Sequence, residues 1–319
     1  MTLDQLVFLC RCPRTKTDLK VSDDNNYVIS ESGYRYPLLN HRTPVLLINR
    51  DTKEEGGTNL SDLRTFETFS EQWKMYQKGD KVWRWKREDL LPYFLHNIGL
   101  EKSQLKGKLI LDLGCGHGIY CSLLAESGAT AVGLDISNGF MITESALPEE
   151  LKPACHFIQA DAFNCPLKEN VFDLVWSSGV LIVTPDTKET FRRVSNVVKK
   201  GGRFYLWLYK PVFYTPLLTV IRSITKHLPE KILVPLGYIL APFFGLVKGF
   251  LNITGLGYRK FEKRNLRENA LSIHDTLATP YRWHHRKEEI IGWFKENGFQ
   301  NITASEDSAL GYGIYGDKI

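Results

Sequence analysis

The chain has 319 residues, enough for one large domain or for one domain with a smaller module. Hydrophobic residues make up 43% and charged residues 24%, which fits a folded globular protein and excludes wholesale disorder. Lysine and arginine exceed aspartate and glutamate by 41 − 36 = 5. This surplus permits an anionic partner, but a dedicated nucleic-acid binder is usually more basic.

Six cysteines in a chain of this length are too few for a disulfide scaffold. The N-terminus lacks the basic start, apolar centre and small-residue cleavage site of a secretory signal. We therefore expect a cytoplasmic protein with reduced thiols. The uncharged run at 232–247 is shorter than the ~20 residues of a spanning helix and contains two prolines and two glycines, so it does not predict a membrane-spanning helix. Its apolar composition leaves membrane association open.

The first half of the chain predicts a small module followed by helices. In residues 1–50, short apolar runs at 5–9, 27–29 and 45–48 alternate with turn-forming residues, which favours a small β-rich module. Residues 51–106 begin with a polar, glycine-containing linker. Apolar residues then recur at three- and four-residue steps, as on one face of a helix: Phe66, Phe69, Trp73 and Tyr76.

Residues 107–210 alternate strictly between strand and helix patterns. This alternation predicts a Rossmann-like, doubly wound α/β sheet, covered by helices on both faces. The expected strands are 108–113, 130–134, 156–160, 172–177 and 203–209, and the expected helices are 120–127 and 188–198.

The last third of the chain begins with an apolar insertion and ends with a further part of the sheet. In residues 211–285, the stretch 211–256 is apolar, and its prolines predict a break into short helices. Residues 286–319 predict a last helix at 286–296 and a strand pair at 299–304 and 311–315. We therefore expect a mostly parallel sheet with an antiparallel edge strand.

The first expected strand leads directly into three glycines at every second position: Gly114, Gly116 and Gly118. Glycine lets the backbone turn sharply and lets a ligand lie against the main chain. The spacing G-x-G-x-G differs from the G-x-G-x-x-G that brings a pyrophosphate to a helix N-terminus. Asp112, two residues before the first glycine, would repel a pyrophosphate and attract a cation.

Polar residues also follow the next three strands. Asp135 ends the second, where a carboxylate can accept both ribose hydroxyls, and Asp161 follows the third, where it could accept from an adenine amino group. The fourth strand ends at Ser177, Ser178 and Gly179. Because ligands of open α/β sheets lie beyond the carboxyl ends of the strands, these positions predict one nucleoside cleft.

These motifs together resemble class I S-adenosylmethionine-dependent methyltransferases of the type 11 group, over roughly residues 108–210. The resemblance rests on LDLGCGHG, VGLDIS, QADA, FDLVWSSGVL and KKGGR, which occur in order. It implies S-adenosyl-L-methionine as cofactor and S-adenosyl-L-homocysteine as product. The cofactor-binding residues that it implies are Asp112, Gly114, Cys115, Gly116, Gly118, Asp135, Ile136, Asp161, Ala162, Ser178 and Gly179.

The resemblance also assigns roles within that set. It implies that the glycines approach the methionine part, that Asp135 takes the ribose, and that Asp161 with the Ala162 backbone holds the adenine. One departure from the group is visible. Relatives often carry a histidine pair after Gly-Val-Leu, and this chain has Ile182 and Val183 there.

Two segments before the core have weaker resemblances. Residues 1–50 resemble small zinc-ribbon-like methyltransferase partner proteins, but only Cys12 of the four expected ligand positions is a cysteine, so we expect no metal. The helix at 66–76 resembles one that closes over the cofactor in part of the group. Phe69 and Trp73 are candidates to face the cofactor, and the alternative is that they belong to the core.

The basic and aromatic run 81–87 fits either a nucleic-acid surface or a solvated face.

The apolar insertion leaves three interpretations open. It could form a helical lid over an apolar substrate, dock on a membrane surface, or form a homodimer interface. Basic residues that would lie near lipid headgroups are Arg222, Lys226, Lys231 and Lys248.

The segment 272–285 contains the densest set of acid–base groups. Its D-x-L-x-x-P-x-Y pattern, which ends at Tyr281, resembles a segment of this methyltransferase subgroup. His274 or His284 could act as a general base, with Asp275 orienting an imidazole. A structural role for these histidines is an equal alternative.

The sequence therefore predicts a methyltransferase that acts on a small-molecule or lipid-like acceptor at oxygen, nitrogen or carbon. The alternatives are an RNA methyltransferase and a non-catalytic, cofactor-binding scaffold. The glycine spacing disfavours a nicotinamide oxidoreductase.

Overall fold

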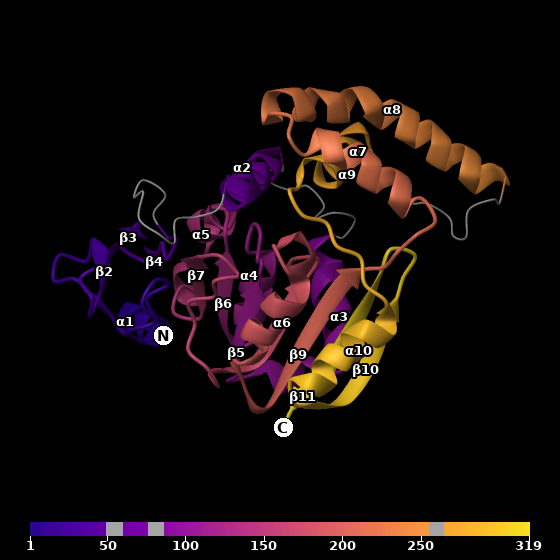
Figure 1. Ribbon diagram of the computed structural model, residues 1–319. Helices are drawn as coiled ribbons and strands as arrows, with labels where there is room; N and C mark the ends of the chain where they lie inside the picture. The colour runs from indigo at the N-terminus through magenta and orange to yellow at the C-terminus, as the bar shows by residue number, and fades with distance from the viewer. Residues whose placement is uncertain (49–59, 76–85, 255–264) are drawn as a thin grey trace.

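The computed structural model describes residues 1–48, 60–75, 86–254 and 265–319. Its centre is a seven-stranded sheet with the order β10-β11-β9-β8-β5-β6-β7 (Figure 1). The strands are β5 (Leu109–Leu113), β6 (Thr130–Asp135), β7 (Cys155–Gln159), β8 (Phe172–Ser178), β9 (Val198–Tyr209), β10 (Phe299–Asp307) and β11 (Gly311–Lys318). The predicted mostly parallel α/β sheet is confirmed.

The antiparallel strand is not at the edge of the sheet, contrary to the prediction. β11 runs antiparallel to both of its neighbours, β9 and β10, and lies between them. The three-residue connection between β10 and β11 makes them a hairpin, which requires antiparallel pairing. The outermost strand, β10, therefore runs in the same direction as the parallel strands.

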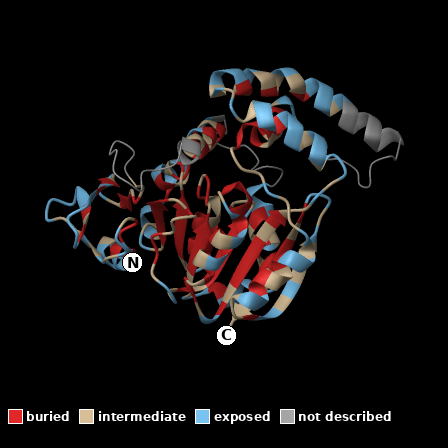
Figure 2. Cartoon of the chain, viewed as in Figure 1, coloured by how far each residue is buried: buried red, intermediate tan, exposed pale blue. Residues whose placement is uncertain are grey.

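Helices cover both faces of the sheet, as strict strand–helix alternation requires. On one face, α3 (Arg87–Ile98) and α4 (Ile119–Glu126) pack on β5, β6 and β8. On the other face lie α6 (Thr187–Ser195) and α10 (Lys287–Glu296). The buried residues are concentrated in the sheet between these layers (Figure 2). Short elements in the connections are α5 (Met141–Ala146) and 3-10 turns at Lys102–Leu105, Glu149–Leu151 and Leu181–Val183.

The N-terminal module is a four-stranded antiparallel sheet preceded by a helix. Its strands are β1 (Leu19–Val21), β2 (Tyr27–Ser30), β3 (Arg35–Leu39) and β4 (Thr43–Pro44). The first apolar run forms a helix, α1 (Leu3–Phe8), instead of part of a β unit. A capping box between Thr2 and Gln5 explains this, because it satisfies the backbone donors at the helix start.

This module is joined to the β7 side of the main sheet. The Leu46 amide donates to the Gln159 carbonyl at 2.8 Å, and the Lys168 amide donates to the Leu9 carbonyl at 2.8 Å. Thr43 Oγ1 donates to Glu144 Oε1 at 2.6 Å, in a buried position. The module's apolar residues belong to the same core cluster as one face of the main sheet. Its packing is therefore continuous with the core.

Four helices of the described chain lie above the carboxyl ends of the parallel strands. α2 (Leu60–Met75) precedes the core, and residues 211–285 contribute α7 (Thr215–Thr225), α8 (Glu230–Thr254) and α9 (Leu266–Ala278) (Figure 1). The predicted break into short helices is wrong for α8, which continues through Pro235 and Pro242. Packing outweighs the hydrogen bonds that these prolines remove, because Leu233 and Ala241 are buried against α9.

None of the helices in the described part of the chain is long and apolar enough to cross a membrane.

Candidate functional site

The glycine turn joins β5 to α4 with three residues in the left-handed region. Gly114, Gly116 and Gly118 have φ values of +75°, +56° and +84°. Residues other than glycine rarely adopt this backbone conformation, and the structure has no space for a side chain at these positions. A Cβ on Gly114 would lie 2.1 Å from Val180 Cγ2, and a Cβ on Gly116 would lie 2.1 Å from Trp73 Cζ2. The turn therefore brings bare backbone against its neighbours.

Trp73 of α2 packs directly on this turn. A Cβ added to Gly139 would lie 2.6 Å from Trp73 Cγ, and the His117 ring centre is 5.1 Å from that of Trp73. Phe69, one turn earlier, is half-buried against the core cluster. Both predicted roles of this helix are thus compatible with the packing: Trp73 lies at the turn and Phe69 contributes to the core.

Asp135 is buried at the end of β6 and binds the turn. Its Oδ2 accepts from the Gly116 amide at 2.8 Å, and its Oδ1 accepts from the Ser137 amide at 2.8 Å and hydroxyl at 2.7 Å. A carboxylate can accept about four hydrogen bonds, so about one position stays available. Burial raises the pKa of Asp135 although these hydrogen bonds oppose the rise.

Asp112 is almost fully buried in β5, behind the turn. Cys121 Sγ donates to Asp112 Oδ2 at 3.7 Å. Burial raises the pKa of Asp112 to about 7, and the Cys121 hydrogen bond opposes the rise. Cys115 is also buried, and a Cβ on Gly133 would lie 2.8 Å from its sulfur. A cation near Asp112 would favour the ionised carboxylate.

Asp161 organises the loop after β7. Its Oδ1 accepts from the Phe163 amide at 2.9 Å, and its Oδ2 accepts from the Asn164 side-chain amide at 2.9 Å. Ala162 beside it is buried, and the Ile136 carbonyl accepts from Gln159 Nε2 at 3.1 Å. Burial raises the pKa of Asp161. These contacts fix a polar loop next to the end of β6.

The end of β8 completes this side of the sheet. Ser178 is exposed, and Gly179 has a φ of +75°. The Gly179 amide donates to the Trp207 carbonyl at 3.0 Å, which ties β8 to β9 at their carboxyl ends. The predicted residues from the four strand ends therefore follow adjacent parallel strands at one edge of the sheet, as the nucleoside-cleft hypothesis requires.

His274 lies in a buried polar cluster between α2, α8 and α9. Its Nε2 is 2.6 Å from Glu230 Oε2, and Thr68 Oγ1 donates to Glu230 Oε1 at 2.7 Å. His274 Nδ1 is buried without a hydrogen-bond partner. The Gln72 side chain, one turn after Thr68 on α2, is also fully buried with neither of its polar atoms paired. Such groups are costly unless a ligand or water satisfies them.

Asp275 binds a different partner from its neighbour His274. Its Oδ2 accepts from Arg282 Nη1 at 3.0 Å. Consecutive residues on a helix point about 100° apart, so the two side chains leave α9 in different directions. Glu230, instead of Asp275, is therefore the carboxylate that orients the His274 ring.

The segment after α9 crosses the ends of β8 and β9. The Arg282 guanidinium lies 4.1 Å from the centre of the Tyr209 ring, and the Trp283 amide donates to the Ile182 carbonyl at 3.0 Å. His284 is half-buried, with its ring centre 6.1 Å from that of Tyr209. Burial, followed by the charges of Arg282 and Arg222, lowers the pKa of His284 to about 4, so this ring is neutral at pH 7. Tyr281 is half-buried.

Three residues near the site have roles that are not predicted from the sequence. Glu230 is the only acidic residue between Lys210 and Phe261, a signal that the sequence offers. Arg222 is predicted near headgroups, but it is buried and donates to the Thr279 carbonyl at 2.7 Å, at the end of α9. His117 beside Trp73 has no distinguishing pattern. Tyr76 and most of the basic run 81–87 lie outside the described residues.

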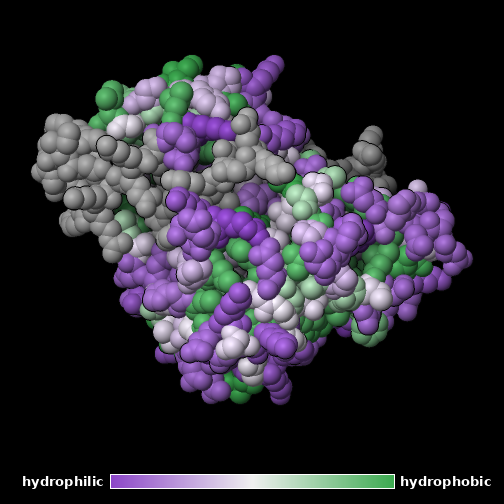
Figure 3. Space-filling model, turned by 180° about the vertical axis from the view of Figure 1, so that it is seen from behind, coloured by the Kyte–Doolittle hydropathy of each residue, from purple (hydrophilic) through white to green (hydrophobic). Residues whose placement is uncertain are grey.

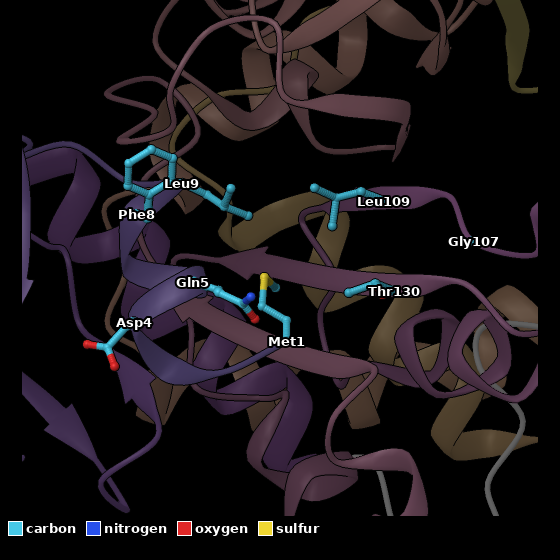
Figure 4. Close-up of a pocket in the computed structure, with 8 residues that line it drawn as sticks. All are labelled: Met1, Asp4, Gln5, Phe8, Leu9, Gly107, Leu109 and Thr130. Atoms are coloured by element: carbon cyan, nitrogen blue, oxygen red, sulfur yellow. The ribbon is translucent and has the colours of Figure 1, made fainter.

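A separate cavity of about 510 Å³ lies between α1 and the amino ends of β5 and β6 (Figure 4). Met1, Gln5 and Leu9 line it on one side, and Leu109 and Thr130 line it on the other. Because ligands of open α/β sheets bind at the carboxyl ends, this cavity is at the wrong edge for the predicted cofactor. Among the described residues, no cluster of histidine, cysteine and acidic side chains has a metal-binding arrangement.

Comparison with known proteins identifies the central part of the chain. Residues 111–206 match the family model described as a methyltransferase domain. The chain is 31% identical over 150 residues to a demethylmenaquinone methyltransferase of Lactococcus lactis, covering 46% of this chain and 58% of that enzyme. It is 31% identical over 119 residues to sterol 24-C-methyltransferase of Pneumocystis carinii, covering 35% of this chain and 31% of that enzyme.

The comparison with solved structures finds magnesium protoporphyrin IX methyltransferase from Synechocystis PCC 6803. It has 17% identity and a TM-score of 0.49, and the match covers 81% of this chain and 100% of that one.

Residues 111–206 therefore form a methyltransferase domain, and its match to methyltransferases supports S-adenosylmethionine as the cofactor. The matches span 58% and 31% of the lengths of the Lactococcus and Pneumocystis enzymes.

Proposed function

We propose that the protein transfers a methyl group from S-adenosylmethionine to a small, lipid-like acceptor. The observation that carries this proposal is the glycine turn with acidic residues at successive strand ends, inside a segment that matches a methyltransferase domain. The Lactococcus and Pneumocystis relatives are named for a quinone precursor and a sterol. These names favour an apolar acceptor.

The residues at the strand ends fit the cofactor. At the left-handed glycines any Cβ would collide with a neighbour, Asp135 lies beside this turn, and a bound cation would favour the ionised form of Asp112. We assign residues 107–210 to cofactor binding, with Asp135 at the ribose and Asp161 with Ala162 at the adenine. When bound, S-adenosylmethionine supplies a methyl carbon already activated by its sulfonium. Trp73 then helps to exclude water at the turn.

We assign residues 211–285 to the acceptor side, as a lid. Glu230 holds the His274 ring at 2.6 Å, so His274 Nδ1 is the atom that would take a proton from an acceptor hydroxyl. Gln72, with its unpaired buried amide, would bind the same polar end of the acceptor. An acceptor that attacks through carbon or a neutral amine places less demand on this base.

A turnover assay tests the proposal. The protein is incubated with S-adenosylmethionine and demethylmenaquinone, a sterol or RNA, and S-adenosylhomocysteine and the acceptor mass are measured. We expect methylation of an apolar acceptor, and loss of at least about tenfold in cofactor affinity for Asp135→Ala, because a buried acceptor of hydrogen bonds is removed. Asp4→Ala, an exposed carboxylate on α1, is the matched control.

Two outcomes would overturn the proposal. Preferential methylation of RNA would favour the RNA methyltransferase alternative. Binding of S-adenosylhomocysteine without transfer to any acceptor would favour the scaffold alternative.

A further inference from the structure

The helices α7 and α8 each carry a row of exposed apolar side chains. On α7 they recur at steps of three and four residues, and on α8 at steps of four and three, so each set follows one helix face. Six of them are 63–73% exposed: Leu217, Val220, Ile224, Ile239, Phe243 and Leu246. We call this set the outer apolar face.

The inward side of α8 is apolar as well. Leu233 and Ala241 are buried against α9, and a Cβ on Gly237 would lie 3.0 Å from the Ala270 carbonyl oxygen. A surface helix of a globular protein normally has one apolar side and one polar side. α8 therefore needs a second apolar environment on the side that faces away from α9. Figure 2 shows the described parts of the two helices as largely exposed at the outside of the molecule.

Among the described residues, the charged side chains at the connection between α7 and α8 that are not directed inward are basic. Lys231 is exposed next to this connection, and Lys226 is half-buried in it. Glu230 is the only acidic residue between Lys210 and Phe261, and it is directed inward to His274 and Thr68. In Figure 3 the upper end of the molecule, where these helices lie, carries apolar side chains at its surface.

We propose that the outer apolar face docks on an anionic membrane surface. Apolar side chains would enter the boundary between headgroups and acyl chains, and the lysines next to them would contact anionic headgroups. The helix α8 would lie on the membrane surface and not insert fully, because its opposite side packs on α9. The inference is independent of the reaction proposed above, but it would place the insertion where a lipid-like acceptor is dissolved.

The charge pattern favours a membrane over a second copy of the chain. A symmetric dimer through this face would bring the same patch of each subunit together. Lysines would then lie near lysines with no acidic side chain from this face between them, which is unfavourable in an interface.

Vesicle sedimentation tests the inference. The full chain is mixed with phosphatidylcholine vesicles or with vesicles of phosphatidylcholine and phosphatidylserine. We expect sedimentation with the anionic vesicles that weakens as salt is raised. The double variant Ile224→Glu with Ile239→Glu should bind these vesicles at least about tenfold more weakly, because two inserted side chains are replaced by anions.

Ile142→Glu is the matched control, because Ile142 on α5 is also exposed but lies outside this face. It should bind vesicles like the unchanged protein. Thermal unfolding should be the same for all variants, since no buried side chain is altered. Absence of vesicle binding by the unchanged protein, or equal binding by the double variant, would refute the inference. So would a dimer in analytical ultracentrifugation that the double variant dissociates without any effect on vesicle binding.

Binding of S-adenosylhomocysteine is measured on the same samples. It should be unchanged in the double variant, because the glycine turn packs against Val180, Trp73 and Phe157 and not against the outer apolar face. A protein that binds vesicles but transfers no methyl group would contradict the proposed function and leave the membrane inference standing.

Discussion

Replacement of Gly114 by alanine tests the geometry of the glycine turn. At a φ of +75°, a side chain costs about 1–2 kcal/mol in backbone conformation. The added Cβ would also lie 2.1 Å from Val180 Cγ2 and 2.6 Å from its Cγ1, both far inside van der Waals contact. Forced overpacking of this kind costs about 1–3 kcal/mol. We therefore expect Gly114→Ala to lower the free energy of unfolding by about 2–5 kcal/mol.

Gly201→Ala is the matched control for this experiment. Gly201 has nearly the same φ, +74°, but a Cβ added to it would meet no atom within 4 Å. Gly201→Ala should therefore lower the free energy of unfolding only by the cost of the backbone conformation, about 1–2 kcal/mol. Urea unfolding at equilibrium measures both losses, and Val180→Ala combined with Gly114→Ala should recover part of the difference. Equal losses for Gly114→Ala and Gly201→Ala would refute the assigned contact with Val180.

Three further predictions concern the buried polar groups and Trp73. Because burial raises the pKa of Asp112 to about 7 from an ordinary 3.8, the folded protein keeps a proton there that the unfolded chain loses. The contribution of Asp112 to the free energy of unfolding is therefore greatest below pH 3.8. It falls by roughly 4 kcal/mol as the pH rises to about 7. Asp112→Asn should remove this fall in urea unfolding at several pH values, and an unchanged slope would contradict the assignment. Glu230→Ala leaves His274 buried with neither ring nitrogen hydrogen-bonded, so it should lower the free energy of unfolding by about 1–3 kcal/mol. Thermal unfolding measures this change, and no loss of stability would show that the Glu230–His274 pair is not formed. S-adenosylhomocysteine should change the fluorescence of the unchanged protein more than that of Trp73→Phe, because the Trp73 indole lies on the turn. An equal change in both would place the ligand elsewhere.

The sheet is largely predictable from the sequence because strand and helix patterns alternate. Continuous apolar runs such as that of β5 are typical of strands buried on both faces, and the glycines locate the first turn. The Gly201–Gly202 pair predicts a turn before the fifth strand. It instead lies within β9, whose register with β8 shifts between Phe172 and Leu174.

Features that depend on long-range packing cannot be inferred from the sequence. Pro235 and Pro242 argue locally against a long helix, and only the packing of α8 on α9 reverses this. The pairing of His274 with Glu230 joins residues 44 positions apart, whereas Asp275 is the obvious neighbour in the sequence. The contact of Trp73 with Gly116 likewise joins two separate elements.

Calorimetric titration with S-adenosylhomocysteine tests the central claim most directly. The glycine turn and the acidic strand ends should bind it, with NAD giving no comparable heat, and Asp135→Ala should weaken binding by at least about tenfold. Preferential binding of NAD, or an adenosyl ligand whose affinity is the same in Asp135→Ala, would contradict the claim that these residues form the cofactor site.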